Sequence, residues 1–103
     1  MYHQINIKAE DQQAQRFLWR DCDNLKEPEI FIYQCMVFGL NCAPSQANEV
    51  RTDHATKSNK KFPNASRVAL NSMYMDDAFD SQDTVEEAKT VANDLIKMFK
   101  EIS

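Results

Sequence analysis

The sequence predicts an α+β fold in which helices pack on one face of an antiparallel sheet. Two observations lead to this prediction. Short segments rich in β-branched and aromatic residues lie in the N-terminal part of the chain, and apolar residues recur at helical spacing near its C-terminus. The predicted order of strands, helix, hairpin and helix indicates an α+β arrangement. A chain of 103 residues is long enough for one domain at most.

Three segments in the N-terminal part of the chain are predicted to be strands. Further along, residues 73–75 and 78–79 flank Asp76-Asp77 like two strands around a tight turn. Residues 2–8 alternate apolar and polar side chains, as a half-buried strand does, and residues 16–20 are predicted to form a second strand. Residues 30–37 give the strongest strand pattern because β-branched and aromatic side chains dominate them. Phe38 and Gly39 end this strand, and Gly39 is the only glycine of the chain.

Three helices are expected after these strands. Residues 44–59 are predicted to be helical because Pro44 sits where a first helical turn tolerates a missing N–H. A short helix is expected over residues 65–70. The C-terminal helix is the clearest, because Asp83 and Glu86 offer a capping-box-like start and apolar residues follow at steps of three or four: Val85, Ala88, Ala92, Leu95, Ile96, Phe99 and Ile102.

The charge of the chain is unevenly distributed. The formal net charge is −4 and the pI is about 5.1, which argues against a generic nucleic-acid binder. Residues 1–48 have a net charge of −2, residues 49–67 of +3 and residues 75–103 of −5. The basic middle could lie along a nucleic-acid backbone, or it could be a solvated helix face. The net charge therefore argues against a nucleic-acid partner, whereas the uneven distribution of charge leaves such a partner open.

The composition also bears on the location of the protein. The sequence has no long apolar run typical of a transmembrane helix, and its N-terminus does not read as a signal peptide. Its three cysteines (Cys22, Cys35 and Cys42) are too few for a disulfide scaffold and fit a reducing compartment. We therefore expect an intracellular protein with no membrane partner.

The segment Tyr74-Met75-Asp76-Asp77 calls for a chemical explanation. Two adjacent carboxylates between short apolar runs repel each other unless a cation neutralises them. At the tip of a hairpin both could point into solvent and bind a hard divalent cation through oxygen. The alternative is a plain polar turn, since aspartate is a favoured turn residue.

A calcium-binding loop is a second alternative that begins at Asp76. Counted in the EF-hand manner, Asp80 falls at position 5 and Glu87 at position 12. Position 3, however, is Ala78, and the required glycine at position 6 is replaced by Ser81. We therefore rank this alternative below the others.

Several motifs, taken in order, resemble the active-site region of reverse transcriptases. Tyr74-Met75-Asp76-Asp77 follows the run MVFGLNCAPS of residues 36–45, and the closer similarity is to the BEL/Pao class of long-terminal-repeat retrotransposons. The resemblance covers roughly residues 1–100. Further motifs that look familiar in the same order are MYHQINIK (1–8), Glu10-Asp11, QRFLWR (15–20), Glu27-Pro28, and Asp80-Ser81-x-Asp83-Thr84.

The resemblance implies a two-metal chemistry. Asp76 and Asp77 match the paired catalytic carboxylates that bind two Mg²⁺ ions. In the intact family enzyme the 3′-hydroxyl of a primer on an RNA or DNA template attacks the α-phosphate of a dNTP, and pyrophosphate leaves. The implied fold is a partial polymerase palm, with residues 1–103 forming the palm with part of the fingers and no complete second domain.

The resemblance also implies four nucleotide-binding residues. Tyr2 matches the aromatic residue beneath the incoming sugar, which excludes a 2′-hydroxyl by blocking its space. Phe38 and Gly39 match a turn whose backbone passes close to the nucleotide and the templating strand, an approach that a missing Cβ permits. Met75 matches the variable residue between Tyr74 and the aspartate pair.

The sequence departs from the family pattern at its ends. The third palm carboxylate, five residues before Tyr2, would fall upstream of Met1, as would the basic residues that hold the triphosphate. The thumb, connection and RNase H regions would follow Ser103. We therefore expect a fragment that is inactive in isolation. Its partners would be the rest of the Pol polyprotein, in the cytoplasm or in the virus-like particle of the intact element.

A non-enzymatic retroelement remnant or interaction module is the alternative function. An upstream reading frame that encodes the missing aspartate would favour a truncated gene, whereas a stop codon would favour a remnant. Because a palm packs against neighbouring domains, we also expect exposed apolar surface near Phe17, Trp19 and Phe31, and marginal or aggregation-prone behaviour.

Overall fold

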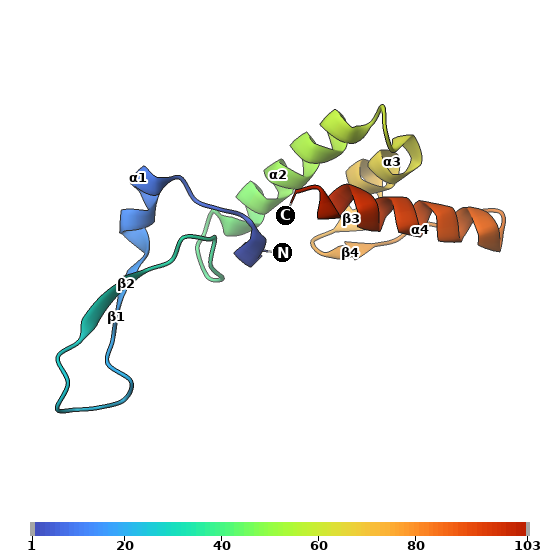
Figure 1. Ribbon diagram of the computed structural model, residues 1–103. Coiled ribbons are helices and arrows are strands. Elements are labelled where there is room, and N and C mark those ends of the chain that lie inside the picture. Colours follow the sequence, from blue (N-terminus) through green and yellow to red (C-terminus); the bar gives the residue numbers. More distant parts are fainter. Residues whose placement is uncertain (1, 103) are drawn as a thin grey trace. The chain divides into compact units, whose positions relative to one another are not determined.

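The structure is a computed structural model that describes residues 2–102. It is a mixture of α-helices and short antiparallel strands, as the sequence predicts at the level of fold class. The chain divides into two compact units between Ala43 and Pro44. Figure 1 shows the elements in chain order. Within residues 2–102, no helix is both long and apolar enough to cross a membrane.

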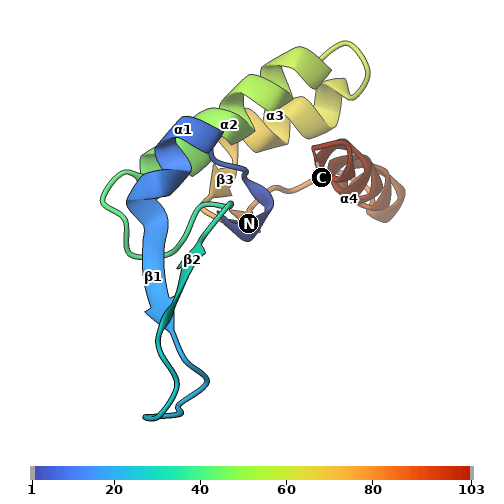
Figure 2. The same ribbon diagram turned by 60° about the vertical axis from the view of Figure 1, so that its left-hand side comes forward.

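The first unit is built around one β-hairpin. Strands β1 and β2 pair antiparallel, with Phe17 opposite Phe31 and Trp19 opposite Glu29. In Figure 2 the two strands leave α1 as a narrow ribbon that ends in a loop. The elements of this unit are the 3-10 helix Tyr2–Gln4, helix α1 (Ala9–Gln12), the 3-10 helix Gln13–Gln15, β1 (Arg16–Trp19) and β2 (Glu29–Ile32).

The predicted strands over residues 16–20 and 30–37 are confirmed as β1 and β2, although β2 is shorter than predicted. After Ile32 the backbone acceptors are used differently. The Gln15 side-chain amide donates to the carbonyl oxygens of Tyr33 and Cys35, at 3.2 and 3.3 Å. One backbone bond, from the Tyr33 N–H to the Gln15 carbonyl at 3.1 Å, continues the pairing beyond Ile32, and these side-chain contacts follow it.

The predicted strand over residues 2–8 is wrong. Its first residues form a 3-10 turn, and only the isolated bridge between Asn6 and Cys35 remains of the pairing. Two backbone bonds hold that bridge: the Ile7 N–H donates to the Gln34 carbonyl at 2.9 Å, and the Met36 N–H donates to the Ile5 carbonyl at 2.8 Å. Helix α1 begins at Ala9, so the segment turns away before a second pair can form.

The aromatic residues of the hairpin are largely exposed, as expected. Trp19 is 50% exposed and Phe31 is 42% exposed, whereas Phe17 is half-buried. Phe17 stacks on Phe31 and on Tyr33, with ring centroids 5.7 and 4.7 Å apart. The other face of the same hairpin is also apolar, because Leu18 and Ile30 pair there and are 66% and 65% exposed.

The second unit contains the longer helices and a second hairpin. The predicted helices over residues 44–59 and 65–70 are confirmed with small shifts of their ends, and Pro63 begins a helix because its missing N–H costs nothing there. The elements are α2 (Ala43–Ser58), α3 (Pro63–Asn71), β3 (Met73–Tyr74), β4 (Asp77–Ala78) and α4 (Val85–Lys100).

Small residues make the core of this unit. They let α2, α3 and α4 approach closely around Met98, which is fully buried at the C-terminal half of α4. A ring nitrogen of His54 on α2 lies 2.8 Å from the Met98 carbonyl oxygen, which ties α2 to α4. The cluster consists of Ala55, Phe62, Ala65, Ala69 and Met98, with Met73, Leu95 and Phe99 packed against it.

The N-cap of α4 is one residue later than predicted. Thr84, not Asp83, is the N-cap: its hydroxyl accepts from the Glu87 N–H at 3.2 Å, and the Glu87 carboxylate accepts from the Thr84 N–H at 3.2 Å. This reciprocal pair is a capping box. Asp83 and Glu86 have the right spacing as well, but the helix begins where the extended backbone of Thr84 meets Val85.

The strands of residues 2–102 form two separate two-stranded sheets, one in each unit. The sequence predicts instead one antiparallel sheet with helices on one face. The difference arises because each strand pairs only with its neighbour along the chain, and the expected N-terminal strand contributes a single bridge.

Candidate functional site

The aspartate pair lies at the tip of the second hairpin. Met73 pairs with Ala78 and Tyr74 pairs with Asp77, so the turn itself consists of Met75 and Asp76. The predicted tight turn is therefore present, but the two aspartates differ in place. Asp76 is in the turn, whereas Asp77 is the first residue of β4. Its side chain lies on the same face of the hairpin as that of Tyr74, directly opposite.

The turn contains a backbone conformation that the sequence analysis missed. Met75 has a φ of 53°, in the left-handed region that favours glycine or asparagine. A residue held there costs on the order of 1–3 kcal/mol, and such residues cluster at functional sites. The sequence gives one indication of this conformation: segment 72–83 contains no glycine that could take the positive φ of a tight turn.

The two carboxylates are accessible. Both aspartates are exposed, and within residues 2–102 neither is engaged in an ion pair. No group of three His, Cys, Asp or Glu side chains suited to a metal ion gathers in this described part of the chain. The hairpin thus offers two carboxylates of its own. That set suits Mg²⁺, which usually keeps several waters and binds through one or two carboxylates plus substrate phosphates.

The remaining predicted site residues belong to the first unit. The rings of Tyr2 and Phe38 are 4.9 Å apart between centroids, and His3 lies edge-on to Phe38 at 5.4 Å. Phe38 is 70% exposed, so it is not a core anchor. The structure brings Tyr2, Phe38 and Gly39 together in one unit and Met75, Asp76 and Asp77 together in the other: the two sets come from different sides of the Ala43–Pro44 division.

Gly39 is required by its backbone rather than by a close contact. Its φ is +91°, a conformation that side chains with a Cβ rarely adopt. A Cβ built at this position would have no atom within 4 Å in the described structure. The positive φ accounts for the glycine within the described structure, and the close approach of a nucleotide to this turn stays a prediction.

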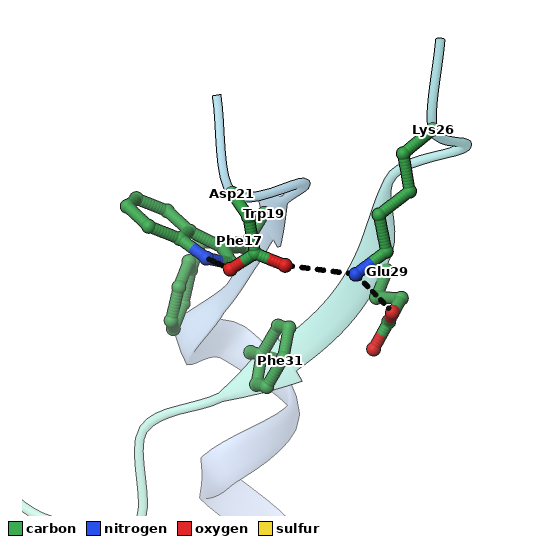
Figure 3. A pocket seen from close by; sticks show the side chains of 6 residues that line it. All are labelled: Phe17, Trp19, Asp21, Lys26, Glu29 and Phe31. Atoms are coloured by element: carbon green, nitrogen blue, oxygen red, sulfur yellow. Dashed lines mark hydrogen bonds and ion pairs between the residues drawn. The ribbon is translucent and has the colours of Figure 1, made fainter. Parts of the chain in front are cut away.

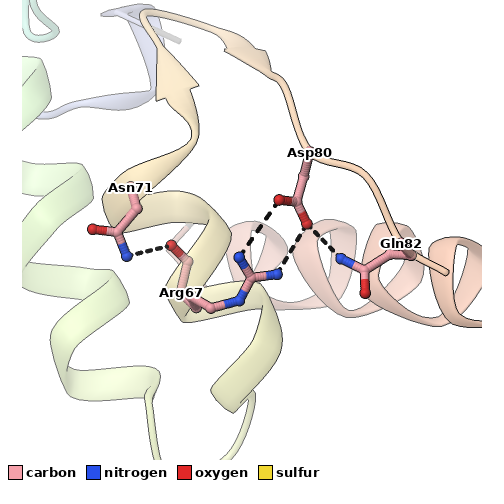
Figure 4. Close-up of polar contacts among 4 residues, drawn as sticks. All are labelled: Arg67, Asn71, Asp80 and Gln82. Atoms are coloured by element: carbon pink, nitrogen blue, oxygen red, sulfur yellow. Dashed lines mark hydrogen bonds and ion pairs between the residues drawn. The ribbon is translucent and has the colours of Figure 1, made fainter.

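Asp80 is held by an arginine from α3. Both terminal nitrogens of Arg67 donate to the Asp80 carboxylate, at 3.5 and 3.0 Å, and the Gln82 amide donates to the same carboxylate (Figure 4). The Asp80 side chain is only 20% exposed. The Arg67 guanidinium holds the pKa of Asp80 below its usual value, and the Gln82 and Ser81 donors act in the same direction. Sequence spacing could not reveal this pair, because its members are separated by a turn and a hairpin.

These contacts answer the calcium-loop alternative. Asp80, at its position 5, is paired with Arg67, and Glu87, at its position 12, is engaged in the capping box of α4. Glu87 therefore belongs to the first turn of a helix rather than to a loop around Asp76. The two side chains that the loop needs are used elsewhere.

Most basic side chains of residues 49–67 make contacts within the second unit. Lys57 pairs with Asp53 one helical turn away at 2.6 Å, and Lys61 pairs with Glu101. Arg51 donates to Asn48 and to the Met73 carbonyl oxygen. Together with the Arg67–Asp80 pair, these contacts engage most of the basic side chains, and the nucleic-acid interpretation of the segment stays a prediction.

The first hairpin also carries a shallow pocket of about 400 Å³ (Figure 3). Its polar part is a chain of three contacts: the Trp19 indole N–H donates to Asp21 at 2.7 Å, and Lys26 bridges Asp21 and Glu29 at 2.8 and 2.9 Å. Lys26 lowers the pKa of Asp21, with Trp19 adding to the effect. The pocket's lining is completed by Phe17 and Phe31.

Comparison of the chain with family models, with curated proteins and with solved structures finds no match.

Proposed function

We propose that this chain supplies the metal-binding hairpin of a reverse transcriptase palm, of the BEL/Pao retrotransposon type that its motifs resemble. The observation that carries the proposal is the placement of Asp76 and Asp77. The two carboxylates lie at the exposed tip of a hairpin that connects two helices, with Tyr74 opposite Asp77.

In this proposal the two aspartates hold Mg²⁺ through their carboxylate oxygens. The bound ions would lower the barrier to nucleotidyl transfer by stabilising negative charge on the attacking and leaving oxygens. Asp76 and Asp77 contribute two negative charges at one end of the hairpin, which attract the cations that a nucleotide triphosphate also binds. The acidic balance of the chain is thus compatible with a nucleic-acid partner.

By the same resemblance, Tyr2, Phe38, Gly39 and Met75 are proposed as nucleotide-binding residues. The contact between Tyr2 and Phe38 supports this assignment, because it keeps two aromatic rings together beside the only glycine. An aromatic ring can support a sugar or a base by stacking. The template-primer, the dNTP and the rest of the polyprotein are the proposed partners.

Binding of Mn²⁺ tests the proposal, because this ion substitutes for Mg²⁺ and broadens the NMR signals of nearby amides. We expect selective broadening of the amides of residues 75–78, and its loss in Asp76→Asn and in Asp77→Asn. Asp83→Asn is the matched control, since Asp83 is also an exposed aspartate of the second unit. Equal broadening in all four proteins would refute the proposed site.

The chain of 103 residues is expected to extend no primer. It contains two of the three carboxylates that the resemblance requires, and no third acidic side chain joins them within the described residues. A primer-extension assay with Mg²⁺ measures this directly. Incorporation that depends on Mg²⁺ and disappears in Asp76→Asn would contradict the expectation of inactivity.

A non-enzymatic interaction module is the second candidate, and the β1–β2 hairpin favours it. Both faces of this hairpin expose large apolar side chains, among them Leu18, Trp19 and Ile30. Exposed apolar area of this kind is typical of a surface that another protein covers. The Mn²⁺ titration separates the two candidates, since an interaction module has no need of metal at Asp76.

A further inference from the structure

The hairpin of residues 73–78, here called the carboxylate hairpin, is too small to be stable by itself. Strands β3 and β4 contain two residues each, and an isolated two-stranded hairpin is marginally stable at best in water. Tyr74 is 75% exposed and Phe79 is 67% exposed, so neither side chain anchors the hairpin in a core. The positive φ of Met75 opposes the turn further. Other contacts must fix the aspartates.

The arm that enters the hairpin is anchored by the helices. β3 follows α3 after one residue, and the Ser72 N–H donates to the Val68 carbonyl at 2.8 Å. Arg51 on α2 donates to the Met73 carbonyl oxygen at 3.4 Å, and the Met73 side chain packs against the core cluster. Helix α3, α2 and the core therefore all hold the side that precedes the turn.

The arm that leaves the hairpin depends on Arg67. The Phe79 N–H donates to the Ser72 carbonyl at 2.7 Å and is the last backbone bond between the arms. Asp80 then meets Arg67, whose two terminal nitrogens grip both carboxylate oxygens, as Figure 4 shows. A guanidinium suits this role because its planar fork fixes direction as well as distance, which a lysine ammonium does not.

We propose that Arg67 is a positioning residue for the aspartate pair. Through Asp80 it fixes the arm that leaves the hairpin against α3, and so fixes the direction in which Asp76 and Asp77 present their carboxylates. Asp80 is three residues from Asp77 along an extended segment, so freeing Asp80 frees β4. The inference rests on the proposed metal site, because it assigns Arg67 a role in that site's geometry.

The test is the Mn²⁺ titration repeated on Arg67→Gln and on Asp80→Asn. We expect each variant to bind Mn²⁺ roughly tenfold more weakly, as is typical when a group that orients a metal ligand is removed. We also expect faster hydrogen exchange of the Phe79 amide in both. The signals of the core around Met98 should stay unchanged, which shows that the unit remains folded.

Two further proteins make the test specific. Arg67→Asp combined with Asp80→Arg reverses the pair and should restore most of the affinity and the protection of the Phe79 amide. Lys57→Gln is the matched control, because it also removes one surface ion pair from a helix of the same unit. It should leave the titration unchanged.

The outcomes distinguish a failure of the positioning role of Arg67 from a failure of the proposed metal site. If Arg67→Gln binds Mn²⁺ as the unaltered chain does while Asp76→Asn does not, the positioning role is wrong and the proposed metal site stands. If the unaltered chain shows no broadening that depends on Asp76, both are wrong. If Arg67→Gln binds Mn²⁺ more weakly and the reversed pair does not restore the affinity, the role assigned to the ion pair is also wrong.

Discussion

Met75 concentrates the strain of the carboxylate turn in one residue. Its φ of 53° is energetically unfavourable for a side chain that has a Cβ, yet the two-residue connection between Tyr74 and Asp77 requires a positive φ there. Glycine would remove the strain. Strain of this kind persists where the surroundings hold it, here Arg51 on one arm of the hairpin and Arg67 on the other.

Replacing Met75 with glycine should therefore stabilise the hairpin. We expect the free energy of opening the hairpin to rise by about 1 kcal/mol, because the relief of strain exceeds the added entropy of the unfolded chain. Hydrogen exchange of the Phe79 amide reports this free energy, since that amide donates across the arms. Met75→Ala keeps the strain and should give no gain. Equal effects of glycine and alanine would contradict this explanation.

Asp80 gives the hairpin a dependence on pH. Its pKa is below the usual value in the folded chain, so the stabilisation is fully present above the unfolded pKa of 3.8 and is lost as the pH falls through the lower, folded pKa. Protection of the Phe79 amide should stay constant at neutral pH and decline only in this acidic range. Asp80→Asn should abolish the decline. A decline already near neutral pH would mean that another group controls the hairpin.

The residues of the candidate site were predictable to different degrees. Asp76 and Asp77 stand out in the sequence because two adjacent carboxylates need an explanation. Gly39 stands out because it is alone. The Arg67–Asp80 pair could not be predicted, because it forms only when β4 returns beside α3, and no local pattern encodes that approach.

At the scale of elements, the start of α4 shows which of two possible capping boxes the chain forms. Asp83 with Glu86 and Thr84 with Glu87 both have the spacing of a capping box, and the structure uses the second. Thr84→Ala should lower the free energy of unfolding by about 1 kcal/mol, whereas Asp83→Ala should leave it nearly unchanged. Chemical denaturation followed by circular dichroism measures both. A larger loss of unfolding free energy in Asp83→Ala than in Thr84→Ala would show that Asp83, the predicted residue, is the N-cap.

The helices were predictable and the first strand was not. Helix α4 has a long apolar period, and prolines mark the starts of α2 and α3, so local signals agree with the final structure. Residues 2–8 have the alternation of a strand, but a strand also needs a partner with free backbone groups. The Ile5 N–H donates to the Tyr2 carbonyl and the Ile7 carbonyl accepts from the Gln12 side chain, so these groups do not extend the pairing and one bridge remains.

At the scale of the whole molecule, exposed apolar surface should govern solution behaviour. Leu18 and Ile30 pair on an exposed face of the first hairpin, and both strands have free edges. We expect the chain to self-associate at high concentration and Ile30→Lys to reduce the association, as measured by sedimentation velocity. Ala14→Lys, which adds the same charge at an exposed site outside the strands, should have little effect. A single monomeric species of the unaltered chain would contradict this expectation.

The charge distribution gains a physical meaning on the same scale. Much of the negative charge lies in and after the carboxylate hairpin, while much of the basic segment is paired within the second unit. Binding of a template-primer by the chain alone should therefore be weak, because few basic side chains are left to contact phosphates. The proposed metal site, rather than the net charge, is the feature by which the proposed function can be judged.

Luminescence of Tb³⁺ tests that site most directly, because Tyr74 lies opposite Asp77 and can transfer excitation to an ion bound there. We expect sensitised emission that Mg²⁺ competes away and that is lost in both Tyr74→Phe and Asp77→Asn, but kept in Asp83→Asn. Emission that survives Asp77→Asn, or that Mg²⁺ leaves unchanged, would contradict the claim that this hairpin is a metal-binding site of a polymerase palm.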